Sequence, residues 1–295
     1  MVDASGHYVE HNLFAYRMTR SFCAEAVRAD DNDRYLCAIL APEPPREALL
    51  ALYAFNIEIA KTRESVSEPM VGEIRLQWWR EAIEELYAGR VRRHAVVGPL
   101  AQAVGTFGLP RAPLDALIDA RSADLDDVAP TDLAALETYG EATSGELTRL
   151  ALHICGGKGV DAETAAKHVG TAWALVGLLR SVPHHARDRR QYLPTDLVEA
   201  AGVDRGDLFE LRGGDAIASV VRQVADAARG HLEEARSGAS SISRACLPAV
   251  LPATLADAYL RCLERQRYDV FKQPIALSQP HRQIRLLWAN MRGRF

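Results

Sequence analysis

Apolar residues recur at steps of three and four along most of this 295-residue chain, the spacing that places them on one face of an α-helix. Runs in which apolar and polar residues alternate, the pattern of a half-buried strand, are nearly absent. The clearest apolar stripes each need a neighbouring helix to cover them. They consist of Leu49, Tyr53, Ile57 and Ala60; of Ala165, Val169, Ala172, Leu175, Val176 and Leu179; and of Ile217, Val220, Val221, Val224 and Leu232.

The breaks between predicted helices are short and carry residues that commonly start or end a helix. Ser67 and Pro69 precede one helix, we expect Pro183 to end another, and Gly238 follows a third. No break is long enough for a domain linker, and no internal repeat is visible. The sequence therefore predicts an all-α fold in which residues 1–295 form a single-domain helical bundle.

Composition and charge argue against several classes of function. A formal net charge of -4 offers no broad positive field for a polyanion, so we expect no nucleic-acid partner. The N-terminus has no basic and apolar pattern of a signal peptide, and no stretch has the apolar length of a membrane span. We therefore expect a cytoplasmic protein, with peripheral membrane contact left open. The 5 cysteines are scattered, which fits neither a disulfide framework nor a zinc site.

Several short segments carry more specific information. They are Asp33-Arg34-Tyr35-Leu36, Ala51-Leu52-Tyr53-Ala54-Phe55, residues 75–89, residues 117–125, and residues 170–196 with the run Tyr192-Leu193-Pro194-Thr195-Asp196. In order and spacing, these segments resemble the squalene and phytoene synthases, which join two isoprenoid diphosphates. The resemblance implies a helical bundle of the isoprenoid synthase type with a central cavity.

The resemblance also shows where metal ligands are missing. Enzymes of that family hold Mg²⁺ with carboxylates on two facing helices, since Mg²⁺ prefers oxygen ligands. The positions that resemble the first acidic motif hold Ala60, Lys61 and Glu64, and a lysine repels a dication. The second motif is replaced by the run Ser181-Val182-Pro183-His184-His185. We therefore predict no catalytic residue, no metal ligand and no cofactor.

The degenerate motif positions remain candidates for lining a ligand pocket. They are Tyr53, Asn56, Ala60, Lys61, Glu64, Arg180, Ser181, His184, His185 and Tyr192. A related hypothesis joins Lys61 to Arg180, Arg187, Arg189 and Arg190 in a basic pocket, because guanidinium groups bind phosphate without a metal.

Three local patterns favour one branch of the family. The runs Ala54-Phe55-Asn56, Ser65-Val66-Ser67-Glu68 and Pro183-His184 resemble the mitochondrial complex I assembly factors related to phytoene synthase. The resemblance implies a scaffold or assembly factor for respiratory complex I (NADH dehydrogenase), with complex I subunits or assembly intermediates as partners.

Two alternatives stay open at this point. One is a prenyl transferase that binds Mg²⁺ through relocated carboxylates, such as Glu58, Glu64 and those in the stretch 119–127. The other is a protein that binds an isoprenoid or a similar lipid in the cavity without chemistry.

Overall fold

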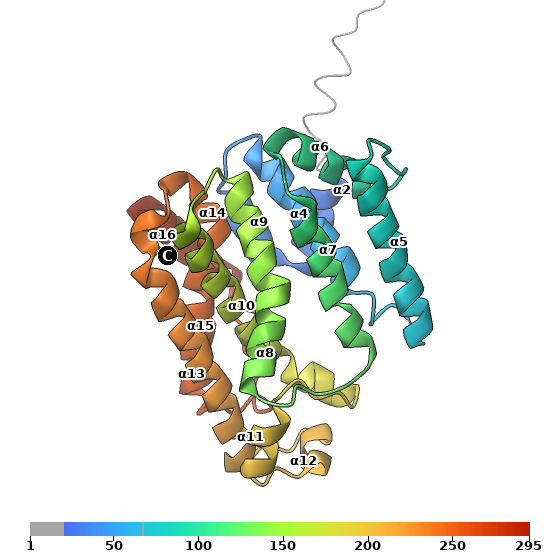
Figure 1. Ribbon diagram of the computed structural model, residues 1–295. Coiled ribbons are helices and arrows are strands. Elements are labelled where there is room, and N and C mark those ends of the chain that lie inside the picture. The colour runs from blue at the N-terminus through green and yellow to red at the C-terminus, as the bar shows by residue number, and fades with distance from the viewer. Residues whose placement is uncertain (1–20, 67) are drawn as a thin grey trace, which may run out of the picture.

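The computed structural model describes residues 21–66 and 68–295, and those residues form helices and connecting turns without a strand (Figure 1). Ser67 and the N-terminal residues behind the cytoplasmic prediction lie outside the described residues. The α-helices are α2 (Phe22–Asp30), α3 (Asn32–Ala38), α4 (Pro45–Ala60), α5 (Pro69–Tyr87), α6 (Val97–Phe107), α7 (Arg111–Ala120), α8 (Leu133–Gly140), α9 (Glu146–Ile154), α10 (Val160–Arg187), α11 (Thr195–Ala200), α12 (Arg205–Phe209), α13 (Asp215–Ser237), α14 (Leu247–Val250), α15 (Pro252–Arg265) and α16 (Gln279–Arg292). Shorter segments are η1 (Ser122–Leu125), η2 (Glu141–Gly145), η3 (Ala239–Ser241) and η4 (Arg244–Cys246).

Helix α10 is the centre of the bundle. It packs against α8, α9, α13 and α15, while α4 packs against α2, α6 and α9 (Figure 1). The predicted apolar stripes on α4, α10 and α13 are buried, except that Ala60 at the end of α4 is only half-buried. One continuous cluster of buried side chains extends from α2 to α16. The prediction of an all-α, single-domain bundle is therefore confirmed.

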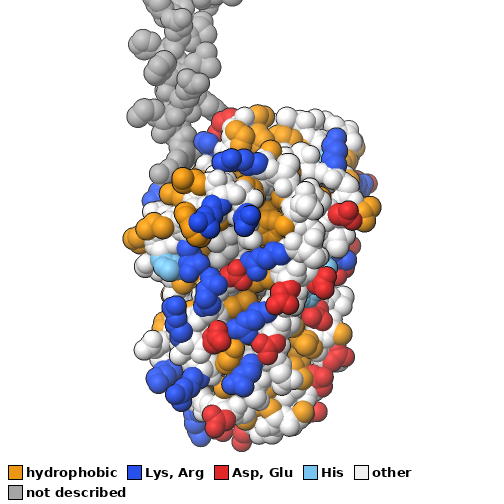
Figure 2. Space-filling view, turned by 90° about the vertical axis from the view of Figure 1, so that its left-hand side faces the viewer, with side chains coloured by type: hydrophobic (Ala, Val, Ile, Leu, Met, Phe, Trp, Pro, Cys, Tyr) orange, Lys and Arg blue, Asp and Glu red, His pale blue; other side chains and the backbone are white. Residues whose placement is uncertain are grey.

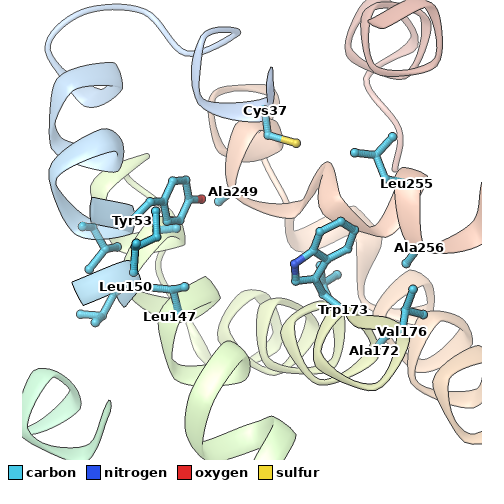
Figure 3. Packing of buried hydrophobic residues seen from close by; sticks show 14 of the residues in the cluster. Cys37, Tyr53, Leu147, Leu150, Ala172, Trp173, Val176, Ala249, Leu255 and Ala256 are labelled. Atoms are coloured by element: carbon cyan, nitrogen blue, oxygen red, sulfur yellow. The ribbon is translucent and has the colours of Figure 1, made fainter. Parts of the chain in front are cut away.

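Large apolar side chains fill most of the space between the central helices. Figure 3 shows Tyr53 from α4 close to Leu147 and Leu150 from α9, and Trp173 from α10 facing the helix that carries Leu255. All of these side chains are buried. Burial of aromatic rings contributes strongly to stability because each removes a large area from water. The space that remains is small and lies beside Trp173.

A π-helical segment, η2, joins α8 to α9 and shapes the wall next to α10. A Cβ atom on Gly170 of α10 would lie 2.2 Å from the carbonyl oxygen of Ser144 and 2.6 Å from the Cα atom of Gly145. Only glycine allows the two backbones to approach this closely. The π segment thereby turns Thr143 and Ser144 towards the interior.

The prediction that Pro183 ends its helix is wrong, because α10 continues to Arg187. Proline removes one backbone hydrogen bond from a helix interior. The final turn also buries Val182 and Ala186, whose packing compensates for that loss. The prediction for Gly238 is confirmed, since α13 ends at Ser237.

No single described helix is long and apolar enough to cross a membrane. Arg244–Val250 and Pro252–Arg265 meet the length and composition of a span only as a pair, and they are bent by 42° with respect to each other.

Candidate functional site

A cavity of about 190 Å³ lies at the junction of α3, α4, η2 and α10. Its wall is mixed, with apolar surface from α9 and α10 and polar groups from the other elements. The lining residues are Arg34, Asn56, Arg121, Tyr139, Thr143, Ser144, Leu147, Trp173, Ala174, Gly177 and Leu178. Of the ten predicted pocket residues, all of which the structure describes, Asn56 is the one that lines this cavity.

Arg34 is a buried cation at the cavity wall. Its guanidinium donates to the carboxylate of Asp31 at 2.8 Å and to the hydroxyl of Ser144 at 2.6 Å. The same group lies 5.7 Å from the ring centre of Tyr53 and 5.8 Å from that of Trp173, within the range of a cation–π interaction. Asp31 and the two rings together hold a charge that burial alone would disfavour. Tyr53 therefore supports the wall from behind.

Arg121 also lines the cavity and belongs to a second buried network. Asp124 accepts hydrogen bonds from Arg121 at 3.3 Å, from the hydroxyl of Tyr139 at 2.8 Å and from that of Tyr192 at 3.2 Å. Burial raises the pKa of both tyrosines above the usual value, so both remain protonated donors. The ring of His185 lies 4.5 Å from that of Tyr192. His185 and Tyr192 thus lie behind Tyr139 rather than at the cavity surface.

Arg180 binds a carboxylate of the protein. Asp33 is 5% exposed and accepts hydrogen bonds from Arg282 at 2.7 Å, from the hydroxyl of Tyr259 at 2.7 Å and from Arg180 at 3.3 Å. The Arg180 guanidinium also stacks on the ring of Tyr259 at 3.7 Å. A carboxylate with three such donors is a structural connection between α3, α10, α15 and α16.

The positions of the first acidic motif lie where α4 ends. Ala60 is its last residue, and Lys61 is exposed and pairs with Asp30 at 2.6 Å. Glu64 is exposed in the following turn. None of these three residues lines the cavity.

The positions of the second motif lie on the last turns of α10. Ser181 is half-buried, and His184 is exposed with its ring nitrogen 3.8 Å from Asp188. Burial, together with the charges of His184 and Arg190, lowers the pKa of His185 from 6.5 to about 4. His185 is therefore neutral near pH 7 and packs as an aromatic ring.

Asp127 links the ends of the two motif helices. It accepts from Arg63, just after α4, at 2.6 Å and from Arg190, just after α10, at 2.9 Å. A carboxylate between two guanidinium groups is already neutralised, and a dication placed there would meet two fixed positive charges. The residues at both motif positions therefore do not fit a Mg²⁺-diphosphate site.

The carboxylates considered as relocated ligands are dispersed. Glu58 binds Arg75 at 2.9 Å, Asp119 binds Arg80 at 2.8 Å, and Asp124 binds the tyrosines described above. Within residues 21–66 and 68–295, no three His, Cys, Asp or Glu side chains converge as metal ligands do. The structure does not bring the proposed basic pocket together either, since Lys61, Arg180 and Arg190 each bind a different carboxylate.

Four residues that line the cavity are not among those predicted from the sequence: Arg34, Arg121, Tyr139 and Trp173. A signal was present for Arg34, which shares the three- and four-residue spacing of Cys37, Ala38 and Ala41, all of them buried. An arginine on an otherwise apolar helix face indicates a buried, partnered cation.

The chain is similar in sequence to proteins of two kinds. The "NADH dehydrogenase (ubiquinone) complex I, assembly factor 6" of Rattus norvegicus is 35% identical over 250 residues, which cover 85% of this chain and 75% of that protein. A "Presqualene diphosphate synthase" of Rhodopseudomonas palustris is 29% identical over 204 residues, covering 68% of this chain and 72% of that protein.

The fold matches a solved structure of a dehydrosqualene synthase with a TM-score of 0.81 and 21% identity, covering 95% of both chains. This likeness confirms the isoprenoid synthase type of bundle. The family model described as "Squalene/phytoene synthase" matches residues 27–287, and the chain therefore belongs to the squalene/phytoene synthase family.

Proposed function

We propose that this protein is a non-catalytic member of the family and acts as an assembly factor for respiratory complex I (NADH dehydrogenase). Its partners would be complex I subunits or assembly intermediates. The similarity to the rat assembly factor over 85% of the chain supports the assembly role. The observation that best supports the absence of catalysis is the ion pairing of Asp127 with Arg63 and Arg190, at the ends of α4 and α10.

The proposal follows from what diphosphate departure requires. Loss of diphosphate from an allylic carbon needs metal ions to absorb the developing negative charge. Here the residues at those positions are Ala60, Lys61 and Ser181, and Asp127, which links the ends of the two helices, already has two arginine partners. The same ion pairs fix the ends of α4 and α10 to the turn after η1, which suits a scaffold more than an opening active site.

Deletion of the gene in its own organism tests the assembly role. We expect less fully assembled NADH dehydrogenase on native gels and an accumulation of subcomplexes. Wild-type protein should restore assembly, and so should a Glu64→Ala variant, because the proposal assigns no chemistry to the one carboxylate retained in the first motif. Normal assembly in the deletion strain, or rescue by wild type but not by Glu64→Ala, would contradict the proposal.

Neither alternative is favoured by a specific feature. The cavity of about 190 Å³ is smaller than the roughly 300–1,000 Å³ typical of small-molecule pockets. An isoprenoid bound in this cavity would therefore require side chains such as Trp173 to move. The cytoplasmic location remains a prediction from the sequence.

A further inference from the structure

Helix α16 presents a row of large apolar side chains to water. Four of these side chains, those of Ile284, Leu287, Trp288 and Met291, are spaced three or four residues apart and therefore share one helix face. Their exposed fractions are 67% for Ile284, 50% for Leu287, 56% for Trp288 and 71% for Met291. We call this set the α16 stripe.

The opposite side of α16 holds the helix to the bundle. Leu286 and Ala289 are buried, and Arg282 binds Asp33 at 2.7 Å. Helix α16 thus has two apolar faces, of which only one is used for packing within the described residues. Isolated exposed apolar residues are common on proteins, but a continuous row on one helix face marks an interaction surface.

Positive charge lines one edge of the α16 stripe. His281, Arg285 and Arg292 occupy that edge. Burial lowers the pKa of Arg285, and Arg261 and Arg265 of α15 lower it further. Asp257 of α15 acts in the opposite direction, although its carboxylate already pairs with Arg236. None of these four arginines of α15 and α16 forms a salt bridge with a residue that the structure describes. The guanidinium of Arg292 stacks 3.6 Å from the ring centre of Trp288.

Within the C-terminal segment that carries the α16 stripe, all charged side chains are basic. Residues 270–295 contain Lys272, Arg282, Arg285, Arg292 and Arg294 but no Asp or Glu, although the whole chain has a net charge of -4. In Figure 2, the side of the molecule formed by the C-terminal helices carries Lys and Arg among hydrophobic side chains on its left, while most Asp and Glu side chains lie towards its right. The basic character is therefore local.

We propose that α16 docks parallel to an anionic lipid bilayer, with the α16 stripe inserted among the acyl chains and the arginines of α15 and α16 at the phosphate level. An amphipathic helix with Trp, Leu and Ile on one face and arginines beside them has the composition of an interfacial anchor. The negative surface potential of an anionic bilayer attracts the basic side chains that line the edge of the stripe. Helix α16 is already folded and needs no rearrangement to insert.

Vesicle co-sedimentation of the full-length protein tests the proposal. One set of vesicles is pure phosphatidylcholine, and the other contains about a third phosphatidylglycerol. We expect binding to the anionic vesicles, weakened by added salt. Replacing the whole stripe (Ile284→Gln, Leu287→Gln, Trp288→Gln and Met291→Gln) should weaken binding by roughly tenfold or more. Replacing two of the charges (Arg285→Gln and Arg292→Gln) should reduce the preference for anionic lipid.

A control variant distinguishes the α16 stripe from general hydrophobicity. Met70 and Ile74 at the start of α5 are 73% and 64% exposed, and Met70→Gln with Ile74→Gln should bind vesicles like wild type. Two results would overturn the proposal. One is equal vesicle binding by wild type and the stripe variant; the other is a wild-type dimer in sedimentation velocity that the stripe variant converts to a monomer. Vesicle binding and sedimentation velocity do not depend on complex I. A failure of the membrane proposal can therefore be distinguished from a failure of the proposed assembly function.

Discussion

At Asp33, one buried carboxylate binds side chains from three other helices. Arg180 comes from α10, Tyr259 from α15 and Arg282 from α16, and Asp33 itself belongs to α3. Removing one partner of a buried ionic network leaves the remaining charges without compensation, which costs more than the pair contributes as a whole. Asp33 is therefore more important for stability than its position next to the cavity-lining Arg34 suggests.

We expect Asp33→Asn to lower the free energy of unfolding by about 3 kcal/mol, because Arg180 and Arg282 would lose their common counterion. Urea denaturation measures this change. Asp119→Asn is the matched control, since Asp119 pairs with Arg80 but its side chain is 64% exposed, and its loss should cost less than about 1 kcal/mol. Equal effects of the two substitutions would mean that the Asp33 network does not stabilise the fold.

Burial of His185 should make the free energy of unfolding depend on pH. Its pKa is lowered from 6.5 to about 4 in the folded protein. Between these values the unfolded chain takes up a proton that the folded protein does not, so the free energy of unfolding decreases as the pH falls through this window. The contribution is complete above about pH 6.5 and is lost towards pH 4.

Replacement of His185 by Phe should reduce the pH dependence of stability in that window by roughly 1 kcal/mol per pH unit. His184→Phe is the control, because His184 is exposed and lies in the same turn. Denaturant unfolding at several pH values provides the measurement. If both variants keep the wild-type slope, burial of neutral His185 is not its source.

Helix α10 contains two glycines that differ in how much space surrounds them. A Cβ on Gly170 would meet the backbone of η2 at 2.2 Å, whereas no described atom lies within 4 Å of a Cβ on Gly177, which lines the cavity. Glycine in a helix interior is normally destabilising relative to alanine. Gly170 therefore serves close packing, and Gly177 has no such role.

We expect Gly177→Ala to raise the free energy of unfolding by about 0.5–1 kcal/mol through helix propensity. Gly170→Ala should lower it by about 1–3 kcal/mol, since α10 must move away from η2. Thermal unfolding of the two variants compares the same substitution within one helix. Effects of the same sign would show that contact with the π segment does not determine the role of Gly170.

The helices could largely be predicted from the apolar spacing. The stripes on α4, α10 and α13 are buried as predicted, because helix packing depends on the period of apolar residues and little else. The turn at Pro183 was mispredicted because burial of Val182 and Ala186, a tertiary effect, outweighs the local preference of proline. The π segment η2 has no recognised sequence signature and depends on contact with Gly170.

In the whole molecule, the sequence indicates which residue types replace the acidic motifs, but it does not indicate which carboxylates pair with the basic residues. The partners of Lys61, Arg63 and Arg180 are Asp30, Asp127 and Asp33, and the last two lie far away along the chain. Such pairings are set by how helices meet in space. For the same reason the cavity wall, to which Arg34 and Arg121 come from distant parts of the chain, could not be derived from local patterns.

Release of diphosphate from farnesyl diphosphate, measured with the purified full-length protein with and without Mg²⁺, tests the absence of catalysis most directly. We expect release no faster than in the absence of protein, because Ala60, Lys61 and Ser181 supply no metal ligand and Asp127 is already paired with Arg63 and Arg190. The Glu64→Ala variant should behave in the same way. Mg²⁺-dependent release by the wild-type protein that Glu64→Ala abolishes would contradict the account.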